Sequence, residues 1–213
     1  MAEVKRSYDA SGRREQAAAR RRAVVAAAQD LFARDGFRAT TIAAVARTAG
    51  VSAESVYKGF GTKAALAKAV FDRVIAGDDE PVPIVERSEA QAIQAEPDVR
   101  RKLQLYAGGV VERQVRSAGV QILIRDGRHV DESLEEVWQN LLTERLTGMT
   151  MLATHLHETG QLRPELSVEE VRDLLWTYIS VEIYELLVLN RGWPLDRYTS
   201  WLSHALVAAL CDQ

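Results

Sequence analysis

Residues 40–58 read TTIAAVARTAGVSAESVYK, two short segments of helical character on either side of a glycine. The apolar residues of the first segment recur at the i, i+3, i+4, i+7 spacing of an amphipathic helix: Ile42, Val45, Ala46 and Ala49. Gly50 supplies the left-handed backbone conformation that a tight turn requires. This arrangement predicts a helix-turn-helix, with the apolar side chains packed between its two short helices.

The second short helix is expected to begin at Ser52, a good helix-capping residue, and to present a small, polar outer face. Small polar side chains let a helix enter the major groove of DNA, where the base edges display hydrogen-bond donors and acceptors. Many helical hairpins without a DNA function share this spacing, so the motif alone indicates DNA binding without proving it.

The flanking sequence also has helical character. An apolar face predicts a first helix from about Arg14 to Gly36, and another helix is expected after Thr62. Residues 77–97 contain glycine, aspartates and three prolines, which predicts a linker. We therefore expect domains at residues 1–76 and 98–213, joined by this linker.

The remaining segments are also read as helices. We expect helices over 98–116 and 119–125, a loop at RDGRH (125–129), and a long helix ending at Gly160. Ser167 and Glu170 match a capping box and open a helix that is expected to run to Gly192. A last helix is expected to follow Pro194. With no convincing alternating pattern, the sequence predicts an all-α fold.

The segment from Val171 to Leu189 is apolar around nearly the whole helical circumference. Such a helix must be buried on all sides. Two arrangements achieve this: a four-helix interface with a second copy of the chain, which we favour, or the core of a monomer.

Composition narrows the class of protein. The 213 residues include one cysteine, Cys211, so no disulfide within one chain or cysteine metal cluster is expected. There is no apolar run of membrane-spanning length and no leader-like segment, which favours the cytoplasm. Lys and Arg outnumber Asp and Glu by 14 to 7 in residues 1–75, and trail them by 13 to 23 afterwards. A basic first third suggests a polyanionic partner, although charge runs are often only solvated surface.

The stretch LFARDGFRATTIAAVARTAGVSAESVYKGFGTKAAL, residues 31–66, closely resembles the DNA-binding domain of TetR-family transcriptional regulators. The resemblance implies an N-terminal three-helix domain with a helix-turn-helix and a C-terminal helical domain for ligand binding and dimerisation. It further implies a homodimer that binds a near-palindromic double-stranded DNA operator, usually as a repressor that a small-molecule effector releases.

Individual roles follow from the same resemblance. The recognition helix corresponds to residues 52–58, and hydroxyl, phenol and ammonium groups beside it match positions that contact phosphate. The implied DNA-binding residues are Thr40, Thr41, Ser52, Ala53, Glu54, Ser55, Tyr57, Lys58 and Lys63.

Two features of this region leave alternatives open. Glu54 either accepts a hydrogen bond from a cytosine amino group or faces solvent. The arginine-rich N-terminal arm either reaches a groove in an ordered way or adds general electrostatic attraction. Its basic residues are Lys5, Arg6, Arg13, Arg14, Arg20, Arg21 and Arg22.

The sequence of the C-terminal domain indicates less about function than that of the N-terminal domain. Large or adaptable side chains and one carboxylate suggest a ligand pocket: Tyr106, Trp138, Met149, Trp176 and Glu182. Glu182 is expected to meet either a cationic ligand or an arginine such as Arg125, or else to form a salt bridge at the dimer seam. The expected dimer interface comprises Leu186, Leu189, Tyr198, Trp201, Leu202 and Ala205.

Three functional classes can be weighed on these features. A ligand-responsive DNA-binding regulator fits best, and a DNA-binding dimer without a ligand, acting constitutively or architecturally, is the alternative. An enzyme is not expected, because no nucleophile arrangement, phosphate loop or metal cluster is recognisable. We expect no metal and no cofactor.

Overall fold

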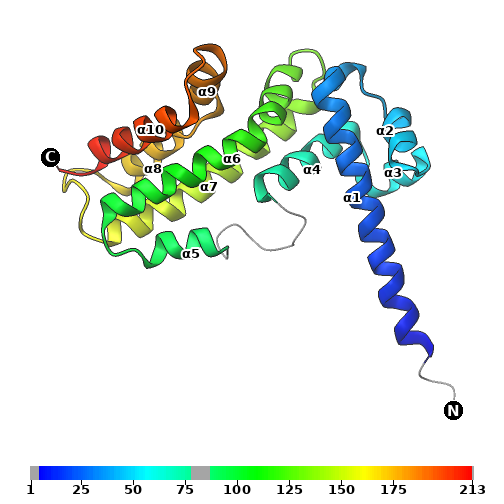
Figure 1. The fold of residues 1–213 in the computed structure, drawn as a ribbon, viewed down its shortest axis with the longest axis horizontal. Helices are drawn as coiled ribbons and strands as arrows, with labels where there is room; N and C mark the ends of the chain where they lie inside the picture. Colours follow the sequence, from blue (N-terminus) through cyan, green and yellow to red (C-terminus); the bar gives the residue numbers. More distant parts are fainter. Residues whose placement is uncertain (1–4, 78–86, 213) are drawn as a thin grey trace. The chain divides into compact units, whose positions relative to one another are not determined.

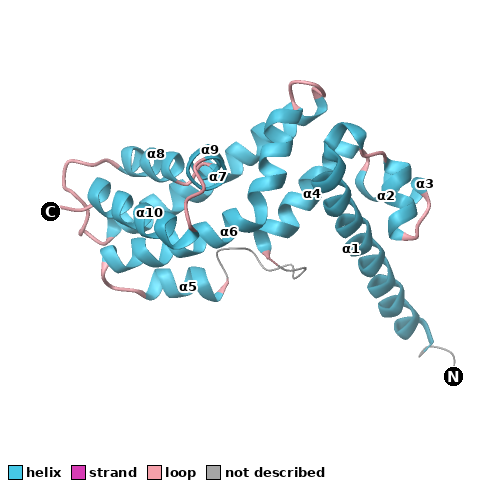
Figure 2. Ribbon diagram, turned by 45° about the horizontal axis from the view of Figure 1, so that its top comes forward, coloured by secondary structure: helices cyan, strands magenta, loops and turns pink. Residues whose placement is uncertain are grey.

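The computed structural model describes residues 5–77 and 87–212, with side chains in the first helix from Gly12 onward. Within these ranges the regular structure is helical, without a strand, which confirms the all-α prediction (Figures 1 and 2). The elements are α1 (Lys5–Ala39), α2 (Ile42–Ala49), α3 (Ala53–Phe60), α4 (Lys63–Ala76), α5 (Ser88–Ala95), α6 (Val99–Gly127), α7 (Ser133–Glu158), α8 (Val168–Tyr178), α9 (Val181–Tyr184), the π-helical η2 (Glu185–Asn190) and α10 (Leu195–Leu210).

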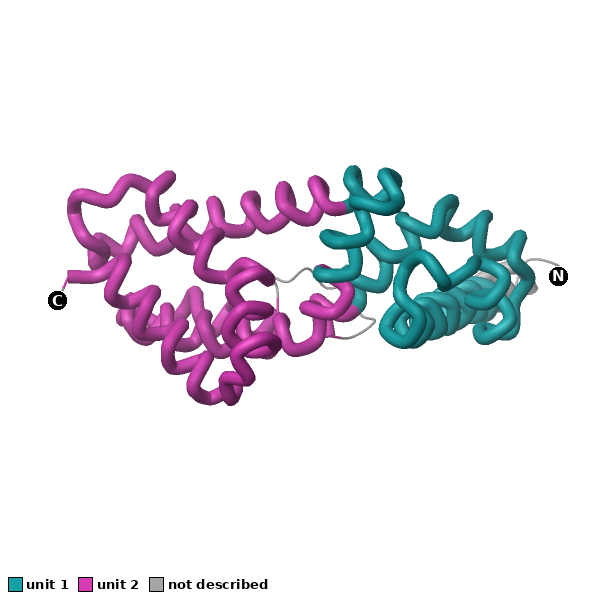
Figure 3. The backbone as a smooth tube through the Cα atoms, turned by 90° about the horizontal axis from the view of Figure 1, so that it is seen from above, with its two compact units in different colours: residues 1–73, 122–137 teal, residues 74–121, 138–213 magenta. Residues whose placement is uncertain are grey.

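The chain divides into two compact units, coloured separately in Figure 3. The first unit contains residues 1–73 and 122–137, and the second contains residues 74–121 and 138–213. The end of α6, the start of α7 and the loop between them therefore cluster with the N-terminal helices. The linear division expected from the sequence, with one linker at 77–97, stays a prediction; residues 78–86 lie outside the described ranges.

The core of the first unit forms where α1 to α4 turn their apolar faces inward. Phe32 and Phe37 stack with ring centroids 5.6 Å apart, across the turn at Gly36. That glycine has φ 76° and ψ 171°, a backbone conformation that side-chain-bearing residues rarely adopt. From α2 and α3, Val45 and Val56 are almost completely buried. The apolar periodicity thus decides which face of each short helix is inside.

In the second unit, a buried lysine fixes α5 against α6. The Lys102 side chain is only 2% exposed, and its Nζ donates to the carbonyl oxygens of Ile93 at 2.8 Å and Gln94 at 2.7 Å. An ammonium group at the end of a helix satisfies carbonyls that have no partner within the helix. Burial lowers the pKa of Lys102, and the charge of Glu96 partly offsets this.

Several helix boundaries differ from those expected. Helix α1 begins at Lys5 and not near Arg14, and α5 lies inside the expected linker. Helix α6 continues through the expected break near Gly119 and through residues 125–127. The isolated glycine there is tolerated because buried neighbours such as Ala118 and Ile124 hold the helix by packing.

The apolar segment after residue 167 is not one continuous helix to Gly192. Helix α8 ends at Tyr178, and the chain resumes as α9 and the π-helical η2. Gln114 of α6 donates to the carbonyl oxygens of Ile179 at 3.0 Å and Ser180 at 3.4 Å. A side chain from another helix therefore satisfies backbone groups that the break exposes, and no local pattern announces this contact.

Candidate nucleic-acid interface

The turn between α2 and α3 is built from three residues with complementary roles. The Thr41 hydroxyl accepts a hydrogen bond from the Ala44 amide at 3.1 Å and caps α2. Gly50 ends that helix in a left-handed conformation, with φ 67° and ψ 31°. The Ser52 hydroxyl accepts from the Ser55 amide at 3.1 Å and caps α3. The expected helix-turn-helix is therefore present, with Gly50 at its turn and Ser52 as the predicted cap of α3.

Helix α3 is held by one buried side chain and displays the others. Val56 is 1% exposed and is the buried residue of this helix. Glu54, Ser55, Tyr57 and Lys58 are exposed, Tyr57 by 55%. A hydroxyl, a phenol and an ammonium group therefore stand on one short helix without large apolar side chains between them. These groups suit phosphate oxygens and base edges.

The end of α3 is tied to α1 by Arg21, which the sequence placed only in a basic stretch. Its guanidinium lies over the Phe60 ring, 4.3 Å from the centroid, and donates to the Gly59 carbonyl at 3.2 Å. Gly61 then turns the chain with φ 76°. The spacing of residues along α1 gives no signal for this role, because the hydrogen-bond partner of Arg21 lies 38 residues away.

Two residues expected to contact DNA are occupied inside the first unit. Thr40 is 1% exposed and its hydroxyl donates to the Gly36 carbonyl at 2.8 Å, so it is not available at the surface. The Lys63 Nζ donates to the carbonyls of Phe37 at 2.8 Å and Thr40 at 3.2 Å, and lies 4.2 Å from the Phe37 ring centroid. Lys63 thus joins α4 to the segment before α2, and its expected role as a phosphate anchor stays a prediction.

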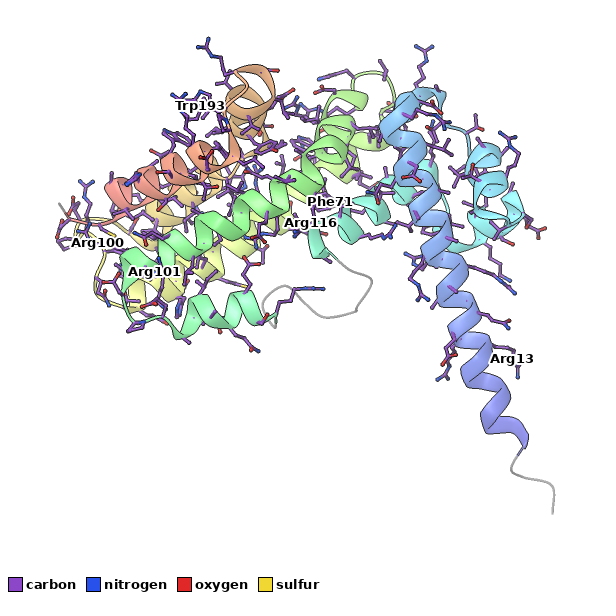
Figure 4. The ribbon with its side chains drawn as sticks, viewed as in Figure 1. Arg13, Phe71, Arg100, Arg101, Arg116 and Trp193 are labelled. Carbon is purple, nitrogen blue, oxygen red and sulfur yellow. The ribbon has the colours of Figure 1, made fainter. Side chains whose placement is uncertain are left out.

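Basic side chains line the exposed N-terminal part of α1. Arg13 is labelled in Figure 4, and Arg14, Arg20 and Arg22 are also exposed. The side chains of Lys5 and Arg6 lie outside the described residues. The expected arm is part of helix α1 itself, which arranges its arginines on a regular scaffold.

Four of the residues expected to form a ligand pocket are buried or half-buried in the second unit. The Tyr106 hydroxyl donates to Met149 Sδ at 3.1 Å, and the guanidinium of Arg145 lies 4.5 Å from the ring centroid of Trp176. We call Tyr106, Arg145, Met149 and Trp176 the Arg145 cluster. Trp138 is 4% exposed.

Burial lowers the pKa of Arg145, and the charge of Glu182, which is exposed on α9, partly offsets this. A surface hollow on α7 is lined by Asn140, Thr143, Glu144 and Thr147, and none of the residues expected to bind a ligand lines it.

Two of the residues expected at a dimer interface are enclosed within the chain. Tyr198 and Leu202 are both 0% exposed, so neither can contact a partner directly. Tyr198 stacks on Trp201 with centroids 5.8 Å apart and belongs to an aromatic core in the second unit. Burial raises the pKa of Tyr198 to about 12. By contrast, Leu186 and Leu189 are 57% and 53% exposed.

The remaining two expected interface residues, Trp201 and Ala205, are half-buried. Trp193, labelled in Figure 4, packs against Trp201 with ring centroids 6.2 Å apart, and the Arg197 guanidinium lies 3.9 Å from the Trp193 ring centroid.

Among the described residues, no group of three or more His, Cys, Asp or Glu side chains is placed to hold a metal ion. In the same ranges, no helix is sufficiently long and apolar to span a membrane.

Known proteins share both the sequence pattern and the fold. The family model described as bacterial regulatory proteins, tetR family, matches residues 24–70, which include α2 and α3. The helix-turn-helix transcriptional regulator TtgR of Pseudomonas putida is 25% identical over 179 residues, covering 83% of this chain and 84% of that protein.

Two solved structures illustrate the likeness of the fold. NalD, the secondary repressor of the MexAB-OprM multidrug efflux pump in Pseudomonas aeruginosa, has a TM-score of 0.65 and 19% identity, covering 91% of this chain and 97% of that chain. The transcriptional regulator FadR from Bacillus subtilis, solved in complex with stearoyl-CoA, has a TM-score of 0.67 and 19% identity, covering 88% and 97%.

Proposed function

Because this chain is a DNA-binding transcriptional regulator of the TetR family and not an enzyme, we propose that it is a homodimeric repressor released from its operator by a small molecule. The observation that carries the proposal is the surface of α3, where exposed polar side chains surround the single buried anchor Val56. The two α3 helices of a dimer would enter successive major grooves about 34–36 Å apart on a near-palindromic site.

Within this proposal, the residues that face DNA are Thr41, Ser52, Ala53, Glu54, Ser55, Tyr57 and Lys58. Tyr57 and Lys58 contact phosphates, and the exposed arginines of α1 add further attraction to the duplex. Glu54 is exposed on α3, and within this proposal it accepts a hydrogen bond from a cytosine amino group. This function places the protein with the chromosome in the cytoplasm.

The dimer is proposed to form through η2 and the neighbouring end of α10. Leu186, Leu189 and Leu195 expose 57%, 53% and 42% of their surfaces, and large apolar side chains exposed close together in sequence are typical of an interface. Leu189→Glu is expected to shift the protein from dimer to monomer in sedimentation. This substitution is a cleaner test than one at Trp201, whose ring packs against three other aromatic rings.

The proposed response to an effector is supported by the division of α6 and α7 between the two units. Each helix has residues in the second unit, including Tyr106 and Arg145, and residues in the first unit, within 122–137. In the first unit, Lys63 is among the charges that lower the pKa of Asp131, after the hydrogen bonds from Ser133. The proposal is that movement of these helices alters the support of α4 and hence of α3. The FadR regulator solved with stearoyl-CoA is a relative in fold for which a bound small molecule is known.

The experiment that tests the function begins with selection of bound sequences from a random DNA pool, followed by affinity measurements on the enriched site. Lys58→Gln is expected to weaken binding to every sequence and to reduce the slope of log affinity against log salt by about 1. Tyr57→Phe is expected to weaken binding about five-fold through loss of one hydrogen bond, with the salt slope unchanged. Failure to enrich any sequence would contradict the proposal.

The alternative is a DNA-binding dimer that has no effector. It predicts that the enriched DNA stays bound in the presence of every compound in a broad chemical panel, whereas the proposed repressor is released by at least one class.

A further inference from the structure

The Arg145 cluster contains hydrogen-bond donors for which the chain supplies few acceptors. Among the described residues, Arg145 Nε and Trp176 Nε1 are buried and have no hydrogen-bond partner. The Tyr106 hydroxyl donates to the thioether sulfur of Met149, which is a weak acceptor. Buried polar groups are normally paired, so two orphan donors beside a weakly paired one need an explanation.

These side chains come from three helices and meet in the second unit. Arg145 and Met149 are four residues apart on α7 and therefore share a face of that helix. Tyr106 reaches Met149 from α6, and Trp176 reaches Arg145 from α8. The Arg145 guanidinium lies over the Trp176 ring, which holds the planar group in a defined orientation.

The charges around the cluster are unequally balanced. Arg113 of α6 forms a close ion pair with Glu89 of α5, with Nη1 and Oε1 2.7 Å apart. For Arg145, the carboxylate that acts on it electrostatically is Glu182, which is exposed on α9. The half-buried Arg145 is thus attracted to Glu182, a carboxylate at the protein surface, where solvent weakens the attraction.

We infer that the Arg145 cluster binds the head group of a small organic anion, such as a carboxylate, whose apolar body packs against Met149 and Trp176. The inference rests on the proposed function, because it names the chemical class of the effector. A carboxylate offers several acceptor sites and one negative charge, which match the donors of Arg145, Trp176 and Tyr106. Met149 has an adaptable side chain that can repack around the body of the ligand.

The geometry also suggests how binding is communicated. An anion at Arg145 competes with Glu182, whose charge acts on Arg145, and Glu182 lies in α9, directly after the break at Ile179 and Ser180. A change in the charge near Glu182 acts at the start of a short segment whose neighbours, Leu186 and Leu189, form the proposed interface. Binding and dimer geometry are therefore coupled through the electrostatic interaction between Arg145 and Glu182.

The test compares three ten-carbon probes with the same tail, each below its micelle-forming concentration: decanoate, decanol and decyltrimethylammonium. Binding to the full chain is followed by calorimetry and by tryptophan fluorescence. Decanoate is expected to bind at least about 10-fold more tightly than decanol, since a hydrogen-bonded charge has that effect on affinity. The ammonium probe is expected to bind most weakly.

Variants locate the site. Arg145→Gln is expected to abolish the preference for decanoate over decanol, whereas Arg172→Gln, which removes an arginine paired with Asp173 in the same unit, leaves the preference intact. Trp176→Phe keeps a ring under the guanidinium and removes one donor, so it is expected to weaken decanoate selectively. Trp176→Phe also tests the site if Arg145→Gln does not fold. Glu182→Gln is expected to tighten decanoate binding by removing the competing carboxylate.

The outcomes separate this inference from the proposed function. An unchanged preference in Arg145→Gln and Trp176→Phe, tightest binding of the ammonium probe, or no binding of any probe would overturn the inference. Decanoate that binds through Arg145 and leaves DNA bound would uphold the inference and contradict effector-controlled repression. If only a neutral or cationic compound releases DNA, effector-controlled repression is upheld and the inference of an anionic effector is contradicted.

Discussion

Helix α3 and the Arg145 cluster use polar side chains in opposite ways. In α3, the polar groups are exposed around the buried Val56, so they remain hydrated until DNA arrives. In the Arg145 cluster, donors are already buried and two of them have no acceptor among the described residues. The polar surface of α3 depends on the rest of the chain mainly through the buried contacts of Val56. The Arg145 cluster forms only because three helices enclose it. The packing of those helices must offset the free-energy cost of removing its polar groups from water.

The largest effect expected from this comparison is loss of the anchor. Val56→Ala removes two buried methyl groups beneath α3 and is expected to lower the free energy of unfolding of the first unit by about 2–3 kcal/mol. Val130→Ala, the same change at a residue that is 67% exposed in the same unit, should cost less than about 0.5 kcal/mol. Chemical denaturation measures both. Equal effects would mean that α3 is not held through Val56.

A smaller effect distinguishes a structural from a DNA-contacting role for Lys63. Lys63→Met removes the ammonium group that donates to Phe37 and Thr40, and is expected to destabilise the first unit by about 1.5 kcal/mol. Lys68→Met, on the same helix, removes an exposed pair with Asp72 and should cost about 0.5 kcal/mol or less. If Lys63→Met instead unfolds like the native chain and weakens DNA binding alone, Lys63 is a phosphate anchor after all.

The smallest effect concerns the caps of the two units. Thr41 and Ser52 cap α2 and α3 with neutral hydroxyls, whereas α8 begins with the charged capping box of Ser167 and Glu170. Hydrogen bonds from the Ser167 amide and hydroxyl lower the pKa of Glu170 below 4.5. The stabilisation that the Glu170 carboxylate gives the folded chain is therefore complete above pH 4.5. It is lost as the pH falls through the lower pKa that Glu170 has in the folded state.

Denaturation across pH tests this assignment. The stability difference between the native chain and Glu170→Gln is expected to shrink as the pH falls below 4.5. Glu169→Gln, at the neighbouring exposed position, is the matched control, and an equal pH dependence in that variant would count against the capping box as the cause.

Much of the DNA-facing region could be predicted from sequence because its determinants are local. Gly50, Thr41 and Ser52 act on backbone groups within a few residues, and Val56 follows the apolar spacing of its own helix. The contacts there that the sequence does not reveal are long-range. Lys63 meets carbonyls 26 and 23 residues away, which its position at the start of a helix does not reveal.

The second unit was harder to predict for the same physical reason. Large side chains identify Tyr106, Met149 and Trp176 as pocket candidates, but nothing in the local sequence singles out Arg145. Its significance comes from being enclosed by Trp176 and from its orphan Nε, and neither is a property of spacing along α7. Similarly, an apolar pattern could not distinguish Leu189, which is exposed, from Leu202, which is enclosed within the chain.

Local sequence therefore determined the helical class, the caps and turn of the helix-turn-helix, and the exposed polar face of α3. These features depend on hydrogen bonds and periodicity that extend over one or two helical turns. Only the tertiary structure decided that Lys63 donates to the Thr40 carbonyl, that the apolar segment breaks where Gln114 donates to its carbonyl oxygens, and that Arg145 is brought against Trp176. Those outcomes depend on which distant side chains share a volume, and burial changes what the same polar group can do.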